Sequence, residues 1–207
     1  KTDNISEIIT TEARKYIPVP ISEVTLDYWV IPHKQEGFYE EPVTGEKKEP
    51  ETTEVLTAAI HNETLSKYHD LGTNSGLSAD VFEIEIFSSI RSTFSHELSA
   101  VLLMDIGASK TKLAIVEYGI VKAFHIVNRG SVDITNAIAR STAMPFAQAE
   151  DVKRKIGLLG NGNDRAVSDV ARLTVEQIFT EAATTIGGFE RKYQKPISKV
   201  ILTGAGS

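Results

Sequence analysis

The sequence has no cysteine, which excludes disulfide bonds, thiolate zinc sites and cysteine nucleophiles. It has no excess of positive charge either: the formal net charge is −6 at pH 7, so nonspecific binding of nucleic acid or of an anionic membrane is not expected. Long apolar runs are missing as well. The longest, Ala100–Met104, is far too short to cross a bilayer, and no signal peptide is visible. What remains is a chain of 207 residues, 41% hydrophobic and 24% charged, able to bury a core.

The two ends of the sequence suggest that it is part of a longer protein. It begins without Met inside a predicted helix over residues 5–17, where apolar side chains recur at helical spacing. It ends on a predicted strand followed by the glycine turn 204–207. We therefore expect sequence to be missing at both ends.

The first half predicts a small α+β module over residues 22–80. Alternating apolar residues predict a strand over Val24–Ile31, and a return strand over Glu54–Ile60 would complete a hairpin. Tyr28 and Trp29 lie on the first of these strands and are expected in a core.

Further elements are predicted around this hairpin. The charged segment 32–53 is predicted to be a solvated loop at its tip, and a contact with a partner there stays open. After the hairpin, the sequence predicts a polar helix near Glu63–Leu71, a strand over Val81–Ile84 and a helix over Ile86–Phe94.

From Ser99 onward the pattern changes to that of an α/β unit. The apolar run Ala100–Met104 is typical of a strand buried on both faces. Strands over Lys112–Glu117 and Ile120–Val127 are predicted to form a hairpin or meander on it, and Lys199–Thr203 is predicted to be the last buried strand. Between them the sequence predicts three helices, over about Asp133–Arg140, Pro145–Ile156 and Val167–Tyr193.

The sharpest motif is the turn after the first buried strand. Asp105 stands at the strand end, where it could hold Mg²⁺ through water. Gly107 and Ala108 would let backbone N–H groups approach phosphate oxygens closely, and Ser109 and Thr111 add hydroxyls that could reach the same phosphates. The alternative is a structural hairpin in which the aspartate only caps the turn.

Two weaker motifs follow along the chain. Gly204 and Gly206 come after the last strand, where glycines would let a nucleobase or ribose lie against the backbone. Glu150 and Lys153 are three residues apart in a predicted helix and share a face, so they could hold ribose hydroxyls. The alternative for this pair is a surface ion pair, which contributes roughly a few tenths of a kcal/mol.

In this order the motifs resemble the second lobe of the actin-like ATPases. The resemblance implies that Asp105–Lys112 is the second phosphate motif, with its aspartate near Mg²⁺. It also implies ribose contacts from Glu150 and Lys153 and an adenosine motif at Gly204–Ser207, so that ATP is the expected nucleotide. Lys110 places a lysine in the phosphate region, where it either binds phosphate or is only solvated.

The resemblance is strongest to the FtsA and PilM group, in which a small inserted subdomain lies ahead of a connecting helix. Glu12–Pro18 resembles the PilM entry into that subdomain, and Asp105–Ser109 is closer to PilM than to the glycine-richer turn of FtsA. The expected fold is therefore α/β, an actin-like ATPase lobe of the ribonuclease H-like type with a small inserted α+β subdomain.

The resemblance also implies a division of the chain. The expected parts are a helix of the first actin-like lobe, the inserted subdomain, a connecting strand and helix, and the second nucleotide-binding lobe, which is truncated after the adenosine motif. In this order they cover residues 1–17, 18–80, 81–98 and 99–207.

As a member of this group, the protein is expected to be an ATP-binding platform for type IV pilus assembly. It would recruit the N-terminal peptide of a PilN-like inner-membrane protein and connect to the pilus motor, so that it lies in the cytoplasm and reaches the membrane through its partner. ATP hydrolysis is left open, and no catalytic residue is identified. The alternatives are an FtsA-like cell-division protein, a scaffold that needs no nucleotide, and a sugar kinase of the same superfamily.

Overall fold

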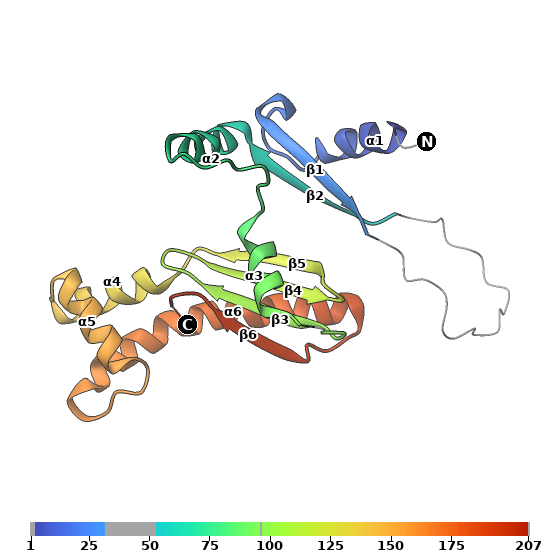
Figure 1. Cartoon of the computed structure of the whole chain (residues 1–207). Coiled ribbons are helices and arrows are strands. Elements are labelled where there is room, and N and C mark those ends of the chain that lie inside the picture. The colour runs from blue at the N-terminus through green and yellow to red at the C-terminus, as the bar shows by residue number, and fades with distance from the viewer. Residues whose placement is uncertain (1–2, 32–52, 96, 207) are drawn as a thin grey trace, which may run out of the picture. The chain divides into compact units, whose positions relative to one another are not determined.

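The computed structural model describes residues 3–31, 53–95 and 97–206 (Figure 1). The chain divides into two compact units, Lys1–Phe82 and Glu83–Ser207, and each has its own secondary structure and packing. The predicted domain boundaries themselves stay predictions. Within the described ranges, no helix combines the length and the apolar character that crossing a membrane requires.

The first unit is built on an antiparallel β-hairpin. α1 spans Asp3–Ala13, and after a short 3-10 turn the chain enters β1, Val24–Val30. β2, Val55–His61, runs back along β1 and pairs with every one of its residues, which confirms the predicted hairpin. α2, Asn62–Asn74, follows directly and extends the predicted polar helix at both ends.

Two aromatic residues of β1 are more exposed than the sequence predicted. Tyr28 is 37% exposed and Trp29 is 53% exposed. In the described part of the chain this sheet has two strands, and a two-stranded sheet covers little of its own surface. The expectation that both residues lie in a core is therefore wrong for this unit. The predicted loop over residues 32–53 lies, but for its last residue, outside the described residues.

The segment Val81–Ile84, predicted to be a strand, is not one. Val81 is 83% exposed, and no strand of the described ranges pairs with this segment. Apolar residues alone do not make a strand where no neighbour takes up the backbone hydrogen bonds. Ile84 instead is the N-cap of α3, Glu85–Thr93, which confirms the helix predicted there.

The second unit contains a four-stranded mixed sheet in the order β5-β4-β3-β6. β3 (Val101–Ile106), β4 (Thr111–Glu117) and β5 (Ile120–Val127) form the predicted antiparallel meander, and β6 (Lys199–Thr203) lies parallel to β3. The turn 118–119 between β4 and β5 has φ values of 53° and 75°. These left-handed values match a tight turn to the twist of its two strands.

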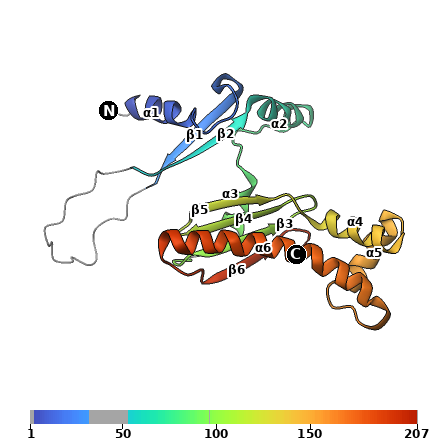
Figure 2. The same ribbon diagram turned by 180° about the vertical axis from the view of Figure 1, so that it is seen from behind.

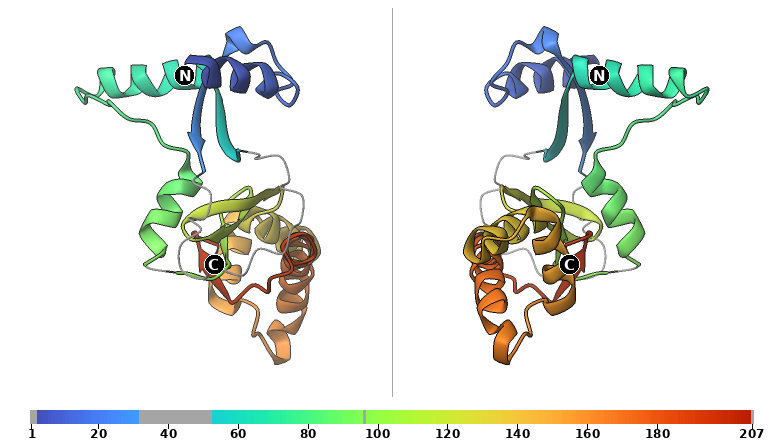
Figure 3. Two further views of the ribbon diagram at one scale, coloured as in Figure 1. Left: turned by 90° about the vertical axis from the view of Figure 1, so that its right-hand side faces the viewer. Right: turned by 90° about the vertical axis from the view of Figure 1, so that its left-hand side faces the viewer.

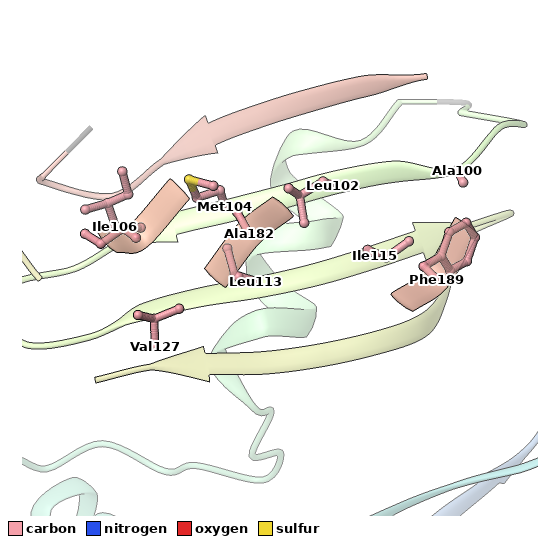
Figure 4. Close-up of a cluster of buried hydrophobic side chains, with 10 residues drawn as sticks. Ala100, Leu102, Met104, Ile106, Leu113, Ile115, Val127, Ala182 and Phe189 are labelled. Atoms are coloured by element: carbon pink, nitrogen blue, oxygen red, sulfur yellow. The ribbon is translucent and has the colours of Figure 1, made fainter. Parts of the chain in front are cut away.

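Helices cover both faces of this sheet (Figure 3). α3 packs on one face, where Ile86 contacts the same core as Leu103, and α6, Arg165–Tyr193, covers the other. Because side chains alternate along a strand, neighbours in β3 serve different cores: Leu102 and Met104 face α6. The buried residues of the α6 core are Ala100, Leu102, Met104, Ile106, Leu113, Ile115, Val127, Ile178, Ala182 and Phe189 (Figure 4).

A third core joins three helices. α4 spans Ser131–Thr142 and α5 spans Phe146–Ile156. Ile138 of α4 and Ala149 of α5, both fully buried, pack with Ala171 of α6. The first half of α6 therefore closes a helical cluster, while its second half covers the sheet (Figure 2). All three predicted helices are confirmed, with small shifts at their ends.

β6 is an edge strand and not the buried strand that the sequence predicted. Val200 is 49% exposed and Leu202 is 53% exposed. Among the described residues, β3 alone lies beside β6, and the strand residues of the α6 core come from β3, β4 and β5. An apolar strand sequence is equally compatible with both positions, because it does not reveal how many neighbours the strand has.

Candidate functional site

The turn between β3 and β4 is the centre of the candidate site. The N–H of Gly107 donates to the carbonyl of Lys110 over 2.9 Å and closes the turn. A Cβ on Gly107 would lie 2.9 Å from the same carbonyl oxygen, so this close turn favours a residue without a side chain. Ala108 and Ser109 are exposed, and no carbonyl of the described residues accepts their N–H groups. The turn therefore offers unpaired backbone donors, as an anion-binding turn requires.

The start of α4 is fastened to this turn. The N–H of Ser131 donates to the carbonyl of Gly107 over 3.0 Å, and the N–H of Val132 donates to that of Ala108 over 2.9 Å. Gly130, directly before the helix, lies so close that an added Cβ would be 2.5 Å from the carbonyl oxygen of Ala108. The position of the turn thus depends on the absence of a side chain at residue 130.

The glycine turn after β6 lies against the end of β3. The N–H of Gly206 donates to the carbonyl of Ile106 over 2.9 Å. Gly204 has a φ of +97°, and a Cβ there would lie 2.5 Å from Oδ1 of Asp105. The fold therefore brings the two predicted glycines next to the predicted phosphate turn, although most of the second unit separates them in sequence.

The predicted ribose pair is tied to the same turn through Ser131. Nζ of Lys153 lies 2.7 Å from Oε2 of Glu150 and donates to the carbonyl of Ser131 over 3.2 Å. The two side chains are only 16% and 24% exposed, and both also bond the hydroxyl of buried Thr135. The pair is therefore more than a surface ion pair. Thr135 was not among the predicted site residues, because only the packing of α4 on α5 brings it to the pair.

Glu150 has the largest electrostatic perturbation of the site. Hydrogen bonds from Lys153, Thr135 and Arg154 stabilise its charged form and lower the pKa of its carboxyl from 4.5 to about 2. A carboxyl with a lowered pKa stabilises the folded state above its unfolded-state pKa, and this contribution is lost as the pH falls through the folded-state value.

We expect Glu150→Gln to lower the free energy of unfolding by about 1 kcal/mol at pH 7, a value reduced for the partial exposure of the group. The difference should shrink towards zero between pH 4.5 and about 2, because the carboxyl is protonated there, first in the unfolded and then in the folded state. Urea unfolding at both ends of this range and at neutral pH measures it. Glu176→Gln, on the exposed side of α6, removes the same charge and should have little effect. A loss from Glu150→Gln that persists at the lowest pH would contradict this account.

Asp105 is buried, with 7% exposure, and it is not a free carboxylate. Its Oδ2 lies 3.2 Å from Nζ of Lys112, which stands directly opposite on β4. The same Nζ lies 2.6 Å from Oε2 of Glu85 in α3. Burial opposes the charge on Lys112, but its hydrogen bonds to Glu85 and Asp105 outweigh burial and raise the pKa of Lys112 above 10.5. Sequence reasoning did not predict Lys112 or Glu85 as partners of Asp105, because only the strand register and the docking of α3 bring them to it.

Thr111 differs from its neighbours in the turn. Its side chain is fully buried, and its hydroxyl donates to the carbonyl of Arg129 over 2.9 Å. In this structure Thr111 braces the start of β4 against the segment before α4. The sequence predicted that this hydroxyl could reach a phosphate. In the structure it is bonded within the protein, and the phosphate contact of Thr111 stays a prediction.

A magnesium ion fits the surroundings of Asp105 poorly. Oδ1 lies against the backbone at Gly204, and Oδ2 is bonded to Lys112, so neither oxygen is open to a hydrated cation. The described part of the chain also contains no group of three or more His, Cys, Asp or Glu side chains that could hold a metal. The magnesium role of Asp105 stays a prediction, and these contacts oppose it.

The sheet, its covering helices and the convergence of two glycine turns with a helix start define an actin-like α/β protein of the ribonuclease H-like type. This confirms the predicted fold class. Within that class, the chain belongs to the family of the type IV pilus assembly protein PilM, whose model matches residues 1–207. The FtsA-like and sugar-kinase alternatives find no support in this match.

Solved structures agree with this fold. A PilM-PilN type IV pilus biogenesis complex is similar to the chain with a TM-score of 0.76 and 24% identity, over 100% of this chain and 56% of that one. MreB5 of Spiroplasma citri bound to ADP has a TM-score of 0.56 and 16% identity, over 71% and 55% of the two chains. The ethanolamine utilization protein EutJ from Carboxydothermus hydrogenoformans has a TM-score of 0.52 and 20% identity, over 67% and 47%. The chain thus spans about half the length of these proteins.

Proposed function

We propose that this protein is an ATP-binding, actin-like platform of type IV pilus assembly that recruits the N-terminal peptide of a PilN-like inner-membrane protein. It would lie in the cytoplasm, reach the membrane through that partner and connect to the pilus motor. The exposed turn 107–110, with backbone donors at Ala108 and Ser109 that no described carbonyl accepts, carries the nucleotide part. Family membership supports the partner part, as does the fact that the similar solved structure is a PilM-PilN complex.

Each group around the turn has a part in nucleotide binding. The backbone N–H groups of the turn would hold the phosphates, and Lys110 adds a positive charge at its end. The glycine turn 204–206, which lies against the end of β3, would take adenosine, as the resemblance to the family implies. Glu150 and Lys153 would share their polar atoms with ribose hydroxyls. The magnesium role of Asp105 remains a prediction from the resemblance to the family.

We expect ATP hydrolysis to be slow or absent. Four carboxylates of the described residues are bonded into the network around the turn, and each is held in an ion pair: Glu85, Asp105, Asp133 and Glu150. A carboxylate whose oxygens already accept bonds from an ammonium group is a poor base towards water. The nucleotide would then act as a structural ligand of the platform.

Calorimetric titration of the full-length protein with ATP, before and after addition of the N-terminal peptide of its PilN-like partner, tests both parts of the proposal. We expect both ligands to bind, and any coupling between them must be reciprocal in affinity. A scrambled peptide of the same composition is the matched control, and phosphate release from the same sample measures hydrolysis. Peptide binding without ATP binding would leave a nucleotide-independent scaffold, and failure of both ligands to bind would contradict the proposal.

A further inference from the structure

Lys110 and Lys112 place two ammonium groups next to the exposed turn. Lys110 ends the turn and is exposed, and no described carboxylate forms an ion pair with it. Lys112, the second residue of β4, is held between Asp105 and Glu85. The two lysines therefore differ in kind: one is available to a ligand and the other already has protein partners.

We propose that Lys112 is a built-in counter-ion to Asp105, in the place that a magnesium ion would otherwise take, and that Lys110 contacts the phosphates, so that ATP binds at this turn without a metal. This inference rests on the ATP binding proposed for the same site. It deepens that proposal by naming the source of positive charge.

The position of Lys112 supports its part. It stands opposite Asp105 in the antiparallel register, so the two side chains share the face of the sheet that α3 covers. The Lys112 side chain is 23% exposed and that of Asp105 is 9% exposed, which keeps the pair in place and largely out of water. A buried carboxylate next to bound phosphates would repel them, and the ammonium of Lys112 cancels that charge.

The charge balance around the turn is then positive without a metal. Lys112 and Asp105 cancel, and Lys153 is balanced by Glu150. Arg129 pairs with Asp133, and Arg154, which is also bonded to Glu150, offsets the charge of Glu85 in this count. The charge of Lys110 is left to attract phosphate, for which a lysine ammonium is a suitable point charge.

Titration of the full-length protein with ATP in EDTA, and again in excess magnesium chloride, tests this inference. The unsubstituted protein should bind ATP in both conditions with affinities that agree within about threefold, and Lys110→Met should weaken binding about tenfold in both. Lys155→Met, which removes an exposed charge from α5, is the matched control and should change either affinity by less than about threefold.

Lys112→Met should make ATP binding depend on magnesium. It leaves the carboxylate of Asp105 without its counter-ion, so we expect about a tenfold loss in EDTA that magnesium restores. Asp105→Asn combined with Lys112→Met removes both charges and should recover binding in EDTA. If Lys112→Met does not fold, the ATP affinities of the double variant and of Lys110→Met still test the inference.

The outcomes separate this inference from the function on which it rests. Binding of ATP by the unsubstituted protein only in magnesium would overturn the inference and leave ATP binding intact. Lys110→Met or Lys112→Met binding as well as the unsubstituted protein in EDTA would also overturn it. Absence of binding in both conditions would overturn the proposed function, and the inference with it.

Discussion

Gly130→Ala is expected to lower the Tm of the second unit by roughly 10 °C. The added Cβ would lie 2.5 Å from the carbonyl oxygen of Ala108 and 2.7 Å from that of Gly107, and neither backbone oxygen can rotate away. To relieve this overlap, α4 would have to move off the turn and lose the two N–H bonds that it donates there. Overpacking and the lost bonds together correspond to about 3 kcal/mol.

Differential scanning calorimetry measures this change, and Gly188→Ala is the matched control. A Cβ at Gly188 of α6 would meet nothing within 4 Å, and alanine is favoured over glycine inside a helix by about 1 kcal/mol. The control should therefore keep or raise the Tm. If Gly130→Ala melted as the unsubstituted protein does, the close contact between the start of α4 and the turn would be refuted.

Ala108→Asp is expected to weaken ATP binding at least tenfold, or about 1.4 kcal/mol. Ala108 is exposed, so the larger side chain has room and the fold should persist. Its carboxylate would lie within the turn that is proposed to hold the phosphates, where like charges repel and the new side chain competes for the backbone donors. Titration calorimetry gives the affinity, and circular dichroism of the same sample verifies the fold.

Ala183→Asp is the control for this substitution. Ala183 is exposed on α6, and the change adds the same charge to the second unit away from the turn. Its ATP affinity should stay within about twofold of the unsubstituted value. Equal losses from the two variants would mean that the general charge of the unit matters, and the turn would lose its assigned role.

The elements that the sequence predicted well are those whose pattern is local. The run that became β3 is apolar throughout because helices cover both of its faces. The pattern of β1 and β2 likewise predicted their pairing. The errors concern how many other elements lie beside a segment. Among the described residues, Val81–Ile84 has no strand to pair with, and too few elements pack on the hairpin to bury Trp29. A short sequence window does not contain that information.

The candidate site divides in the same way. Gly107 and Gly204 were predicted to lie in the site because glycine lets a phosphate or a nucleobase approach the backbone closely. In the structure Gly107 lies in a close turn and Gly204 has a φ of +97°, and both conditions favour glycine. The partners of Asp105 were not predicted, since Lys112 reaches it through strand register and Glu85 through the docking of a helix. For Thr111 the sequence position was informative but the side-chain direction was not. The residue lies in the predicted phosphate turn, yet its hydroxyl donates to the carbonyl of Arg129.

The single tryptophan of the chain, Trp29 on β1, lies in the first unit, whereas the candidate nucleotide site lies in the second. Fluorescence excited only at the indole ring therefore reports on the first unit. Fluorescence during denaturation would follow the first unit alone, while far-ultraviolet dichroism would be dominated by the second, which contains the 29-residue α6. Two separate midpoints would show that the halves melt independently, and one shared midpoint would show that they melt as a single cooperative body. The native chain thus contains its own optical label for this experiment.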